Sequence, residues 1–363
     1  MAINAEQVKL LARQCGFELA GIAAALPLSD YDRFEHWREA GLAGEMTYLT
    51  DRRGDLRQDP RHLFPDAKTI ICVGKLYNTD QPYSVERPAH EVGWISRYAW
   101  GADYHDVLRR GLEQLRAKLE EVHGEPFSSR ICVDTAPLLE RSYAREAGLG
   151  WIGRNTCLIN QGSGSWFFLG ELLTSLELAP DSPPPDRCGT CTRCIEACPT
   201  AAIVPSEHGW RIDARTCISY LTIEKRGPVD TTLQAGIGDH LFGCDICQDV
   251  CPWNRKAPDT MDSAFERGAS LPSLLELSEY SDEDFRREFR KSPVWRAKYR
   301  GFLRNVAIAM GNSRDPAMLD RLRELAAHPD ASISAAAVQA LAILSHGEVH
   351  SSEVDAISSC VPL

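Results

Sequence analysis

The sequence lacks features that would place the protein in a membrane, in an export pathway or on bulk nucleic acid. No apolar run approaches the ~20 residues that a membrane-spanning helix requires. The first residues have neither the basic nor the apolar region of a secretory signal, so we expect a cytoplasmic protein without a membrane partner. The formal net charge of −11 disfavours wholesale wrapping by nucleic acid, although a local basic cluster could still bind it.

Cysteine is the residue type in excess. The chain has 363 residues, enough for two or three domains, and its 44% apolar and 25% charged residues are typical of a globular protein. It also has 13 cysteines. Because a reducing cytosol disfavours disulfides, a dense cysteine array there indicates metal binding.

Strand and helix patterns alternate over residues 1–180, which predicts an α/β fold without indicating the order of the strands. Short runs rich in β-branched and aromatic residues mark the strands, and amphipathic periodicity marks the helices. The strands are predicted at 69–77, 130–134 and 164–178, and helices at 104–122 and 137–148.

The rest of the chain divides at a proline-rich hinge, residues 179–186. The cysteine region follows it, and a polar connector rich in charge occupies about 255–300. Three short Ala/Leu-rich helical segments after residue 300 resemble HEAT-type repeats, and a simple helical tail fits the pattern equally well. The predicted domains are 1–180, 181–265 and 266–363.

The first cysteine motif is RCGTCTRCIEACPTAAI at residues 187–203. Its first three cysteines have the C-x2-C-x2-C spacing that wraps one 4Fe–4S cluster. The fourth, Cys198, is followed by Pro199, as in the bacterial ferredoxin run. In two-cluster ferredoxins this last cysteine ligates the other cluster, so the stretch is one half of a larger site.

A second motif, GCDICQDVCPWN, lies at residues 243–254. It lacks a third closely spaced cysteine, and Cys217 upstream is the obvious substitute. The ferredoxin rule then gives two complete sets of four thiolates. The sets are Cys188, Cys191, Cys194 and Cys251 for one cluster, and Cys198, Cys217, Cys244 and Cys247 for the second.

Zinc is the competing metal, because paired C-x2-C knuckles are typical of structural zinc sites. Two C-x2-C-x3-C-P tails are more specific and favour iron–sulfur clusters. Among the other cysteines, apolar neighbours predict core positions for Cys15, Cys72 and Cys132. Cys157 stays unassigned, and Cys360 lies in the C-terminal tail.

Two charged residues before the hinge are candidates for catalysis or for ligand binding. Asp134 ends a predicted strand, where burial could raise its pKa and make it a general acid. A helix-start position ahead of Pro137 is an equally good interpretation. Arg57 is either an anion clamp or a surface charge.

Several segments together resemble a known family. RQDPRHLFPDAKTI, SRYAWGADYHDVLR and VDTAPLLERSYAREAGLGWIGRNTCLI, with the paired cysteine motifs and the helical tail, are similar to epoxyqueuosine reductases over nearly the whole chain. The resemblance implies an oxidoreductase that reduces the epoxide of epoxyqueuosine at the tRNA wobble position to queuosine. It implies cobalamin in a nitroreductase-like α/β domain, a ferredoxin-like domain with two 4Fe–4S clusters, and a HEAT-like domain.

The resemblance also assigns roles by matching motif. Asp134 becomes the proton donor for the oxygen released from the epoxide, and Arg141 lies close to the substrate. The partners implied are the epoxyqueuosine-bearing tRNA and an external electron donor, and we expect a monomer. The residues expected along cobalamin are Arg57, Ser96, Asp134, Asn155, Leu158, Leu169, Ser219, Phe242, Gly243 and Asp245.

Composition and spacing do not indicate cobalamin independently. DYHDVL at 103–108 only mimics the corrinoid pattern Asp-x-His-x-x-Gly, because it lacks the glycine and lies in a predicted amphipathic helix. We therefore interpret His105 as a structural residue rather than a cobalt ligand.

A basic segment precedes the helical tail. Residues 286–304 contain eight Lys and Arg residues against Glu288, with Trp295 and Tyr299 between them. Phosphate contacts combined with base stacking use this mixture, so we expect Arg296 and Lys298 to bind tRNA. A solvated helix face is the alternative interpretation.

Two other functions are compatible with parts of the sequence. A reductive dehalogenase would use the same corrinoid and clusters on a small organohalide, but usually carries an export signal. A ferredoxin-like electron carrier with an RNA-binding appendage would not need ~180 residues ahead of the clusters.

Overall fold

The computed structural model describes residues 3–86, 92–266 and 272–357, with side chains described up to residue 345. The chain forms two compact units, each assembled from separate segments. Unit 1 comprises Met1–Val85, Trp100–Arg215 and Asp245–Arg267, and unit 2 comprises Glu86–Ala99, Thr216–Cys244 and Gly268–Leu363. Among the helices described, none has the length and apolar character needed to cross a membrane.

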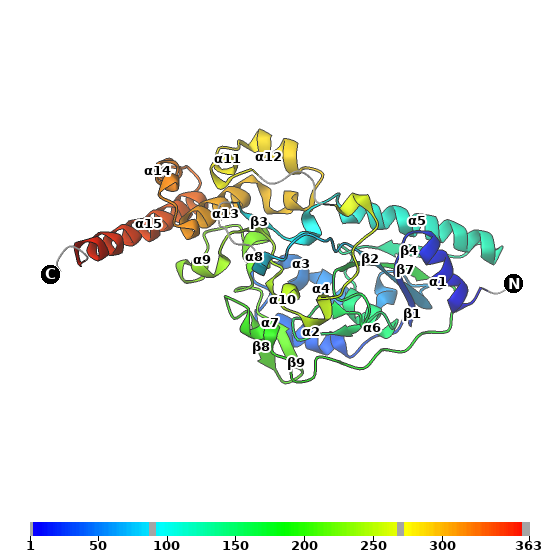
Figure 1. The fold of residues 1–363 in the computed structure, drawn as a ribbon. Coiled ribbons are helices and arrows are strands. Elements are labelled where there is room, and N and C mark those ends of the chain that lie inside the picture. The colour runs from blue at the N-terminus through cyan, green and yellow to red at the C-terminus, as the bar shows by residue number, and fades with distance from the viewer. Residues whose placement is uncertain (1–2, 87–91, 267–271, 358–363) are drawn as a thin grey trace. The chain divides into compact units, whose positions relative to one another are not determined.

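A four-stranded sheet forms the centre of unit 1 (Figure 1). Its strand order is β1-β2-β7-β4, and every neighbouring pair is antiparallel. Strands predicted from the sequence at 69–77, 130–134 and 164–178 are present as β2, β4 and β7. The bounds are β1 (Leu19–Ala24), β2 (Thr69–Leu76), β4 (Ser129–Cys132) and β7 (Phe167–Thr174).

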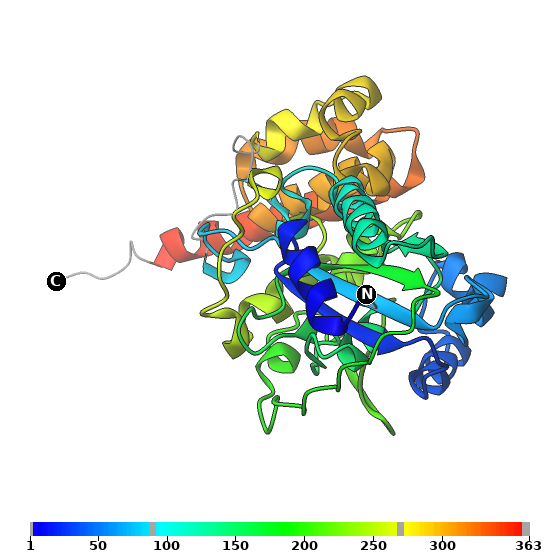
Figure 2. The same cartoon turned by 90° about the vertical axis from the view of Figure 1, so that its right-hand side faces the viewer.

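Helices cover both faces of this sheet. On one face α5 (Tyr104–His123) packs so closely that a Cβ on Gly170 would lie 3.1 Å from Leu112. On the other face lies α6 (Glu140–Glu146), whose C-cap residue Ala147 approaches Gly21 of β1 closely. A Cβ on Gly21 would lie 1.9 Å from the Ala147 carbonyl oxygen. Figure 2 shows α1 (Ala5–Gln14) and α5 beside the sheet. The glycines therefore set the helix-to-sheet distance.

The remaining elements of unit 1 are short and carry the cysteine motifs. Two of the cysteine-bearing segments form single-turn helices, and the β8–β9 hairpin follows the first motif. These elements are α2 (Asp30–Glu39), α3 (Thr47–Thr50), α4 (Arg52–Leu56), β5 (Trp151–Ile152), β6 (Leu158–Ile159), α7 (Arg193–Glu196), β8 (Ile203–Ser206), β9 (Gly209–Ile212) and α10 (Ile246–Asp249).

Unit 2 is mainly helical, with β3 and β10 as a parallel pair. The region expected to be a polar connector contains α11 and α12, each started by a serine capping box. The three expected helical segments are present as α13, α14 and α15. The bounds are β3 (Trp94–Ile95), α8 (Ile218–Ile223), α9 (Thr231–Ile237), β10 (His240–Phe242), α11 (Leu274–Ser278), α12 (Asp282–Phe289), α13 (Lys298–Ser313), α14 (Leu319–Ala326) and α15 (Ala331–Ile357).

Candidate functional site

Four thiols predicted for one cluster line a single hollow in unit 1. Its volume is about 250 Å³. Burial, and then the three neighbouring thiols, raises the pKa of Cys194 to about 11. Four thiols this close together disfavour one another's thiolate form, and a bound iron cluster would relieve this because its positive iron ions stabilise the thiolates. The cysteines of this hollow are Cys188, Cys191, Cys194 and Cys251.

Aromatic and basic side chains surround the same hollow. Trp151 and Trp253 meet edge to face, with ring centroids 5.0 Å apart, and both pack against the buried Cys251. Guanidinium groups would offset the negative charge of a thiolate-ligated cluster. The arginines lining the hollow are Arg154, Arg187 and Arg193. In the described part of the chain, no three His, Cys, Asp or Glu side chains are gathered as for a single metal ion.

The second cysteine set is divided between the units. Cys198 and Cys247 belong to unit 1, whereas Cys217 and Cys244 belong to unit 2. Within unit 1, a hydrogen bond between the Cys157 and Cys247 thiols lowers the pKa of Cys157. The cysteine that the sequence left unassigned therefore lies against a predicted cluster ligand.

Of the cysteines predicted to be core residues, Cys72 and Cys132 are buried. Cys15 is only half-buried, because it follows α1 as the helix C-cap, so its predicted core position is wrong. Cys360 lies outside the described residues.

Asp134 follows β4 in a left-handed backbone conformation, with φ of 50°. Few residues other than glycine adopt this conformation, and aspartate is among those that do. His105, from the first turn of α5, lies against it: Nε2 is 3.3 Å from Asp134 Oδ2, and Nδ1 is 2.7 Å from Asp103 Oδ1. Burial lowers the pKa of His105, but the two carboxylates outweigh it and raise that pKa to about 9. An imidazolium therefore stands beside Asp134 at neutral pH.

Glu140, the first residue of α6, contacts Asp134 from a second side. Its carboxylate accepts a hydrogen bond from the Asp134 backbone N–H. Burial, and then the charge of Asp134, raises the pKa of Glu140 to about 8. Arg57 is 8% exposed, and burial lowers its pKa while the Glu140 carboxylate acts in the opposite direction. Arg57 is therefore a buried cation near carboxylates rather than a surface charge.

The predicted corrinoid residues of the 153–158 loop are tied to the cysteine region. The Asn155 side chain is buried and donates to the Cys247 carbonyl over 3.2 Å. Arg141 of α6 donates to the backbone carbonyl of Thr156 in the same loop. Leu158 is buried in the core cluster under α6, and Leu169 is half-buried at its edge. The structure thus brings these side chains to one region of unit 1.

Other predicted corrinoid residues lie at the start of α10 and in unit 2. Asp245, in unit 1, is almost fully buried. In unit 2 the Ser96 backbone N–H donates to the Phe242 carbonyl over 2.7 Å. Gly243 has φ of 70°, and a Cβ there would lie 2.5 Å from the Ser96 Cβ. Ser219 is in α8, whose Thr222 hydroxyl accepts the Gly243 N–H at 2.9 Å.

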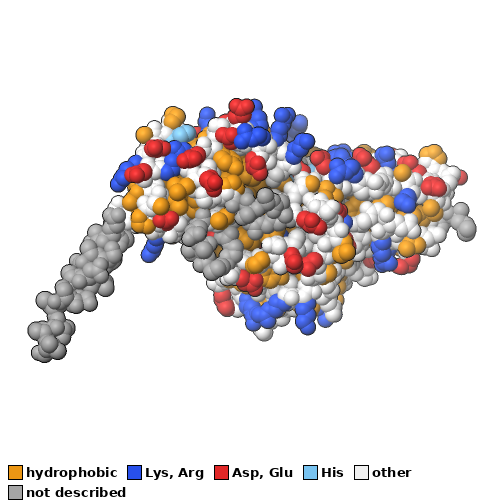
Figure 3. All heavy atoms as spheres, turned by 45° about the horizontal axis from the view of Figure 1, so that its top comes forward, with side chains coloured by type: hydrophobic (Ala, Val, Ile, Leu, Met, Phe, Trp, Pro, Cys, Tyr) orange, Lys and Arg blue, Asp and Glu red, His pale blue; other side chains and the backbone are white. Residues whose placement is uncertain are grey.

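The basic segment 286–304 is divided among α12, a 3₁₀ turn at Pro293–Ala297 and α13. Arg304 does not face solvent: it is fully buried and donates to the backbone carbonyls of Leu221, Lys225 and Gly227. Arg304 is therefore not part of an RNA-binding surface, and the prediction that included it among the eight basic residues of this segment is wrong at this position. Figure 3 shows that Lys and Arg side chains on the visible face are interspersed with Asp and Glu.

The two predicted RNA contacts of this segment differ. Lys298 is exposed, with its ammonium 4.7 Å from the centre of the Trp295 ring. Arg296 forms an ion pair with Glu224 over 2.6 Å. Trp295 also stacks on Phe285, with centroids 5.7 Å apart, so this ring belongs in part to the aromatic core.

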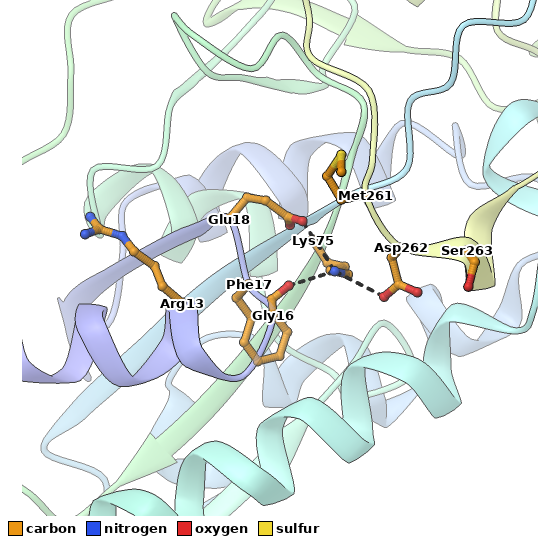
Figure 4. Close-up of a pocket in the computed structure, with 8 residues that line it drawn as sticks. All are labelled: Arg13, Gly16, Phe17, Glu18, Lys75, Met261, Asp262 and Ser263. Atoms are coloured by element: carbon orange, nitrogen blue, oxygen red, sulfur yellow. Dashed lines mark hydrogen bonds and ion pairs between the residues drawn. The ribbon is translucent and has the colours of Figure 1, made fainter.

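A larger hollow of about 590 Å³ in unit 1 contains none of the predicted site residues (Figure 4). Three of its charged groups are paired with one another: Glu18, Lys75 and Asp262. The Lys75 ammonium contacts the Gly16 carbonyl at 2.7 Å, Asp262 at 3.1 Å and Glu18 at 3.3 Å. These bonds fasten the segment after the second cysteine motif to β2.

Two family models match the chain. The model described as 4Fe-4S double cluster binding domain matches residues 187–254, and that described as Epoxyqueuosine reductase QueG, DUF1730 matches residues 57–135. The epoxyqueuosine reductase of Xanthomonas campestris pv. campestris is 40% identical over 313 residues, which cover 85% of this chain and 87% of the relative. That of Pseudomonas aeruginosa is 41% identical over 316 residues, covering 85% of each chain.

The chain belongs to the epoxyqueuosine reductase family. Its fold agrees with a crystal structure of epoxyqueuosine reductase with an epoxyqueuosine-modified tRNA-Tyr stem loop (TM-score 0.83, 29% identity, 93% of this chain and 89% of that chain). It also agrees with the Bacillus subtilis epoxyqueuosine reductase whose Asp134 catalytic loop is swung out of the active site (TM-score 0.83, 29% identity, 93% and 90% covered). The predicted mixed α/β fold with a double 4Fe–4S domain is confirmed, and the zinc alternative is wrong.

Sequence reasoning about this epoxyqueuosine reductase family member missed the acid–base surroundings of Asp134. His105 was interpreted as structural, although the Asp103-x-His105 spacing at a helix start could have indicated a paired imidazole. Glu140 was not singled out within the helix predicted at 137–148. Glu171 stands alone among apolar residues in FFLGELLT, and that pattern was a usable signal for a buried carboxyl.

Proposed function

We propose that this chain reduces the epoxide of epoxyqueuosine at the tRNA wobble position to queuosine, using cobalamin supplied with electrons by two 4Fe–4S clusters. The observation that carries the proposal is the match to epoxyqueuosine reductases over most of both chains, together with the double-cluster domain. The protein would act as a monomer in the cytoplasm, with an external one-electron donor.

The proposed architecture consists of three consecutive domains. Residues 1–180 form the nitroreductase-like cobalamin domain, 181–265 the ferredoxin-like domain, and 266–363 the HEAT-like tRNA-binding domain. The sharing of thiols follows the ferredoxin rule: Cys251 completes the first cluster, and Cys198 joins the second. The shared hollow of the first four thiols supports this assignment.

The donor set in unit 1 fits a corrinoid, a largely apolar ring with polar amide substituents. Half-buried Leu169 and Leu139 lie at the edge of the core cluster and offer apolar contact. Asn155 and Arg57 provide an amide and a guanidinium for polar substituents. The remaining proposed contacts are Ser96, Asp134, Leu158, Ser219, Phe242, Gly243 and Asp245. The corrinoid, when bound, supplies low-potential electrons at cobalt.

Asp134 is the proposed proton donor to the oxygen that leaves the epoxide. Its contact with His105 supports this role, because the imidazolium can supply the proton that Asp134 gives in the first transfer. The Glu140 carboxylate holds the Asp134 backbone through the N–H bond. Reducing the epoxide to an alkene and water takes two electrons and two protons, so the leaving oxygen must receive two protons at this point.

The tRNA would contact Arg141, Arg296 and Lys298. Exposed Lys298 is the best placed for a phosphate, since Arg296 already pairs with Glu224. Arg141 is anchored to the Thr156 carbonyl and is proposed to lie near the modified base.

Anaerobic purification followed by an absorption spectrum separates this function from its rivals. We expect both iron–sulfur and corrinoid bands from reconstituted protein, whereas an electron carrier would show clusters only. Mass spectrometry of tRNA from a strain lacking the gene should show epoxyqueuosine in place of queuosine. Normal queuosine in that strain, without a second enzyme of this activity, would contradict the proposal. A dehalogenase would leave tRNA unaffected.

A further inference from the structure

Glu171 is a carboxyl group in the middle of the central sheet. It lies on β7 and is 0% exposed. Its register partners are Cys72 on β2 and Cys132 on β4. Residues directly opposite in antiparallel strands share a face, so Glu171 points toward the apolar cluster under α6. Leu169, two residues earlier on the same face, is a proposed corrinoid contact.

Neither carboxyl oxygen of Glu171 has a hydrogen-bond donor among the described residues, and the same is true of Glu140 Oε1. The two carboxyl groups nevertheless interact, and a side-chain hydrogen bond with Glu140 contributes to the raised pKa of Glu171. Two ionised carboxylates cannot hydrogen-bond, because both are acceptors. A proton on one of them supplies the missing donor.

The charges around the pair also favour a retained proton. Burial, and then the charges of Glu140 and Asp134, raises the pKa of Glu171 well above its usual range. Arg57 and Arg141 oppose the rise of the Glu140 pKa without cancelling it. The titratable groups that face Glu171 from β2 and β4 are Cys72 and Cys132, whose own pKa values are raised by burial. Burial and the neighbouring negative charges therefore both favour a proton on the pair.

We propose that Glu140 and Glu171 share one proton and deliver it to Asp134 during turnover. This inference rests on the proposed function. The alkene forms when both C–O bonds of the epoxide break and the oxygen leaves as water. Asp134 gives that oxygen its first proton, which it takes from the His105 imidazolium. The Glu140–Glu171 pair reprotonates Asp134 for the second transfer, and two electrons arrive through the clusters. Solvent reloads the pair after product release.

The geometry suits a proton store that works while substrate covers the site. Asp134 is 42% exposed on its side chain and can exchange protons with water in the free protein. A bound tRNA would cut off this exchange, but would leave Glu140 beside Asp134, held by its bond to the Asp134 backbone N–H. Glu140 and Glu171 are positioning and proton-supplying residues and do not touch the substrate.

A first test uses the full-length, cluster-loaded protein without substrate. Infrared difference spectra between pH 6 and pH 9 should contain the C=O stretch of a buried protonated carboxyl in the wild type. Glu171→Gln should remove the shared-proton band, because glutamine has the shape of the protonated side chain without its acidic proton. Glu177→Gln, at an exposed position beyond the end of β7, is the matched control and should leave the band unchanged. Absence of the band from the wild type at pH 7 would overturn the proposal.

A second test measures one turnover of the fully reduced, corrinoid-loaded enzyme on an epoxyqueuosine stem loop. Glu171→Gln and Glu140→Gln should each lower the single-turnover rate at least about tenfold and change its pH profile, with KM for the stem loop unchanged. Equal rates and pH profiles for wild type and both variants would overturn the relay. The pH profile separates it from a purely structural role.

The two tests also separate this inference from the proposed function. If the wild type shows the carboxyl band but never converts the epoxide, the proposed function fails. If the wild type converts the epoxide and the Glu171→Gln protein is indistinguishable from it, only the proton store fails. A rate that falls in His105→Asn but not in either glutamate variant would assign the resupply to His105 and contradict the proposal.

Discussion

The imidazole Nε2 of His105 lies 3.3 Å from the carboxylate Oδ2 of Asp134, although 29 residues separate them in the chain. The other ring nitrogen contacts Asp103, which fixes the orientation of the ring. A left-handed backbone at Asp134 and the N–H bond to Glu140 hold the carboxylate in place. The proposed proton donor therefore has a charged partner on one side and a buried carboxyl on the other.

Replacing Asp134 with asparagine should stop proton donation while keeping the shape of the side chain. We expect Asp134→Asn to retain clusters and corrinoid, measured by absorption and metal analysis, and to lose turnover by about 10²–10⁴-fold. Asp320→Asn, at an exposed position on α14, is a control and should keep full turnover. Wild-type turnover in Asp134→Asn would rule out the donor role.

His105 should make stability depend on pH. Its pKa is about 9 in the folded protein, against 6.5 as its ordinary value. The folded state therefore binds the proton more tightly, and the stabilisation is complete below about pH 6.5 and lost as pH rises through about 9. The melting temperature of His105→Asn should lie at least about 2 °C below wild type at pH 6, with the difference disappearing near pH 10. A constant difference at all pH values would show that this ion pair does not contribute.

The sharing of thiols can be tested by iron content. Cys251→Ser should lose one cluster, that is about four of about eight iron atoms per chain, and keep the second. Cys15→Ser, at a half-buried position away from both motifs, is the control and should keep all the iron. If Cys251→Ser and Cys198→Ser removed the same cluster, by their electron paramagnetic resonance spectra, the proposed exchange of cysteines between the two motifs would be wrong.

The contribution of Lys298 to tRNA binding is testable by charge reversal. Lys298→Glu should weaken binding of a tRNA stem loop and lower the slope of log K against log salt by about one, because a phosphate contact is lost. Arg323→Glu is the matched control on α14, where the arginine is exposed and pairs only locally with Asp320. Equal loss in the two variants would indicate a general charge effect rather than a binding surface.

Local sequence patterns predicted the helices and strands of this fold, but they did not predict which strands pair. The run at 69–77 is β2 and the amphipathic segment at 104–122 is α5, because periodicity and β-branched content act over a few residues. Strand pairing is not local. The register that places Glu171 opposite both Cys72 and Cys132 joins segments up to about a hundred residues apart, and no pattern in the sequence fixes it.

The same limit applies to the sites. Cysteine spacing predicted which thiols line the first hollow, since a cluster demands fixed ligand spacing. The count of basic residues failed at Arg304, because its guanidinium donates to buried backbone carbonyls and cannot reach a phosphate. A side chain's role there depends on burial, and burial is set by tertiary packing.

The most direct test is conversion of the modified base by the purified protein. Anaerobic enzyme with both clusters, cobalamin and a strong one-electron reductant is mixed with an epoxyqueuosine-bearing tRNA stem loop, and the nucleosides are analysed by mass spectrometry. We predict that epoxyqueuosine loses one oxygen atom and becomes queuosine, and that omission of cobalamin prevents this change. Unchanged epoxyqueuosine with fully loaded and reduced enzyme would contradict the account.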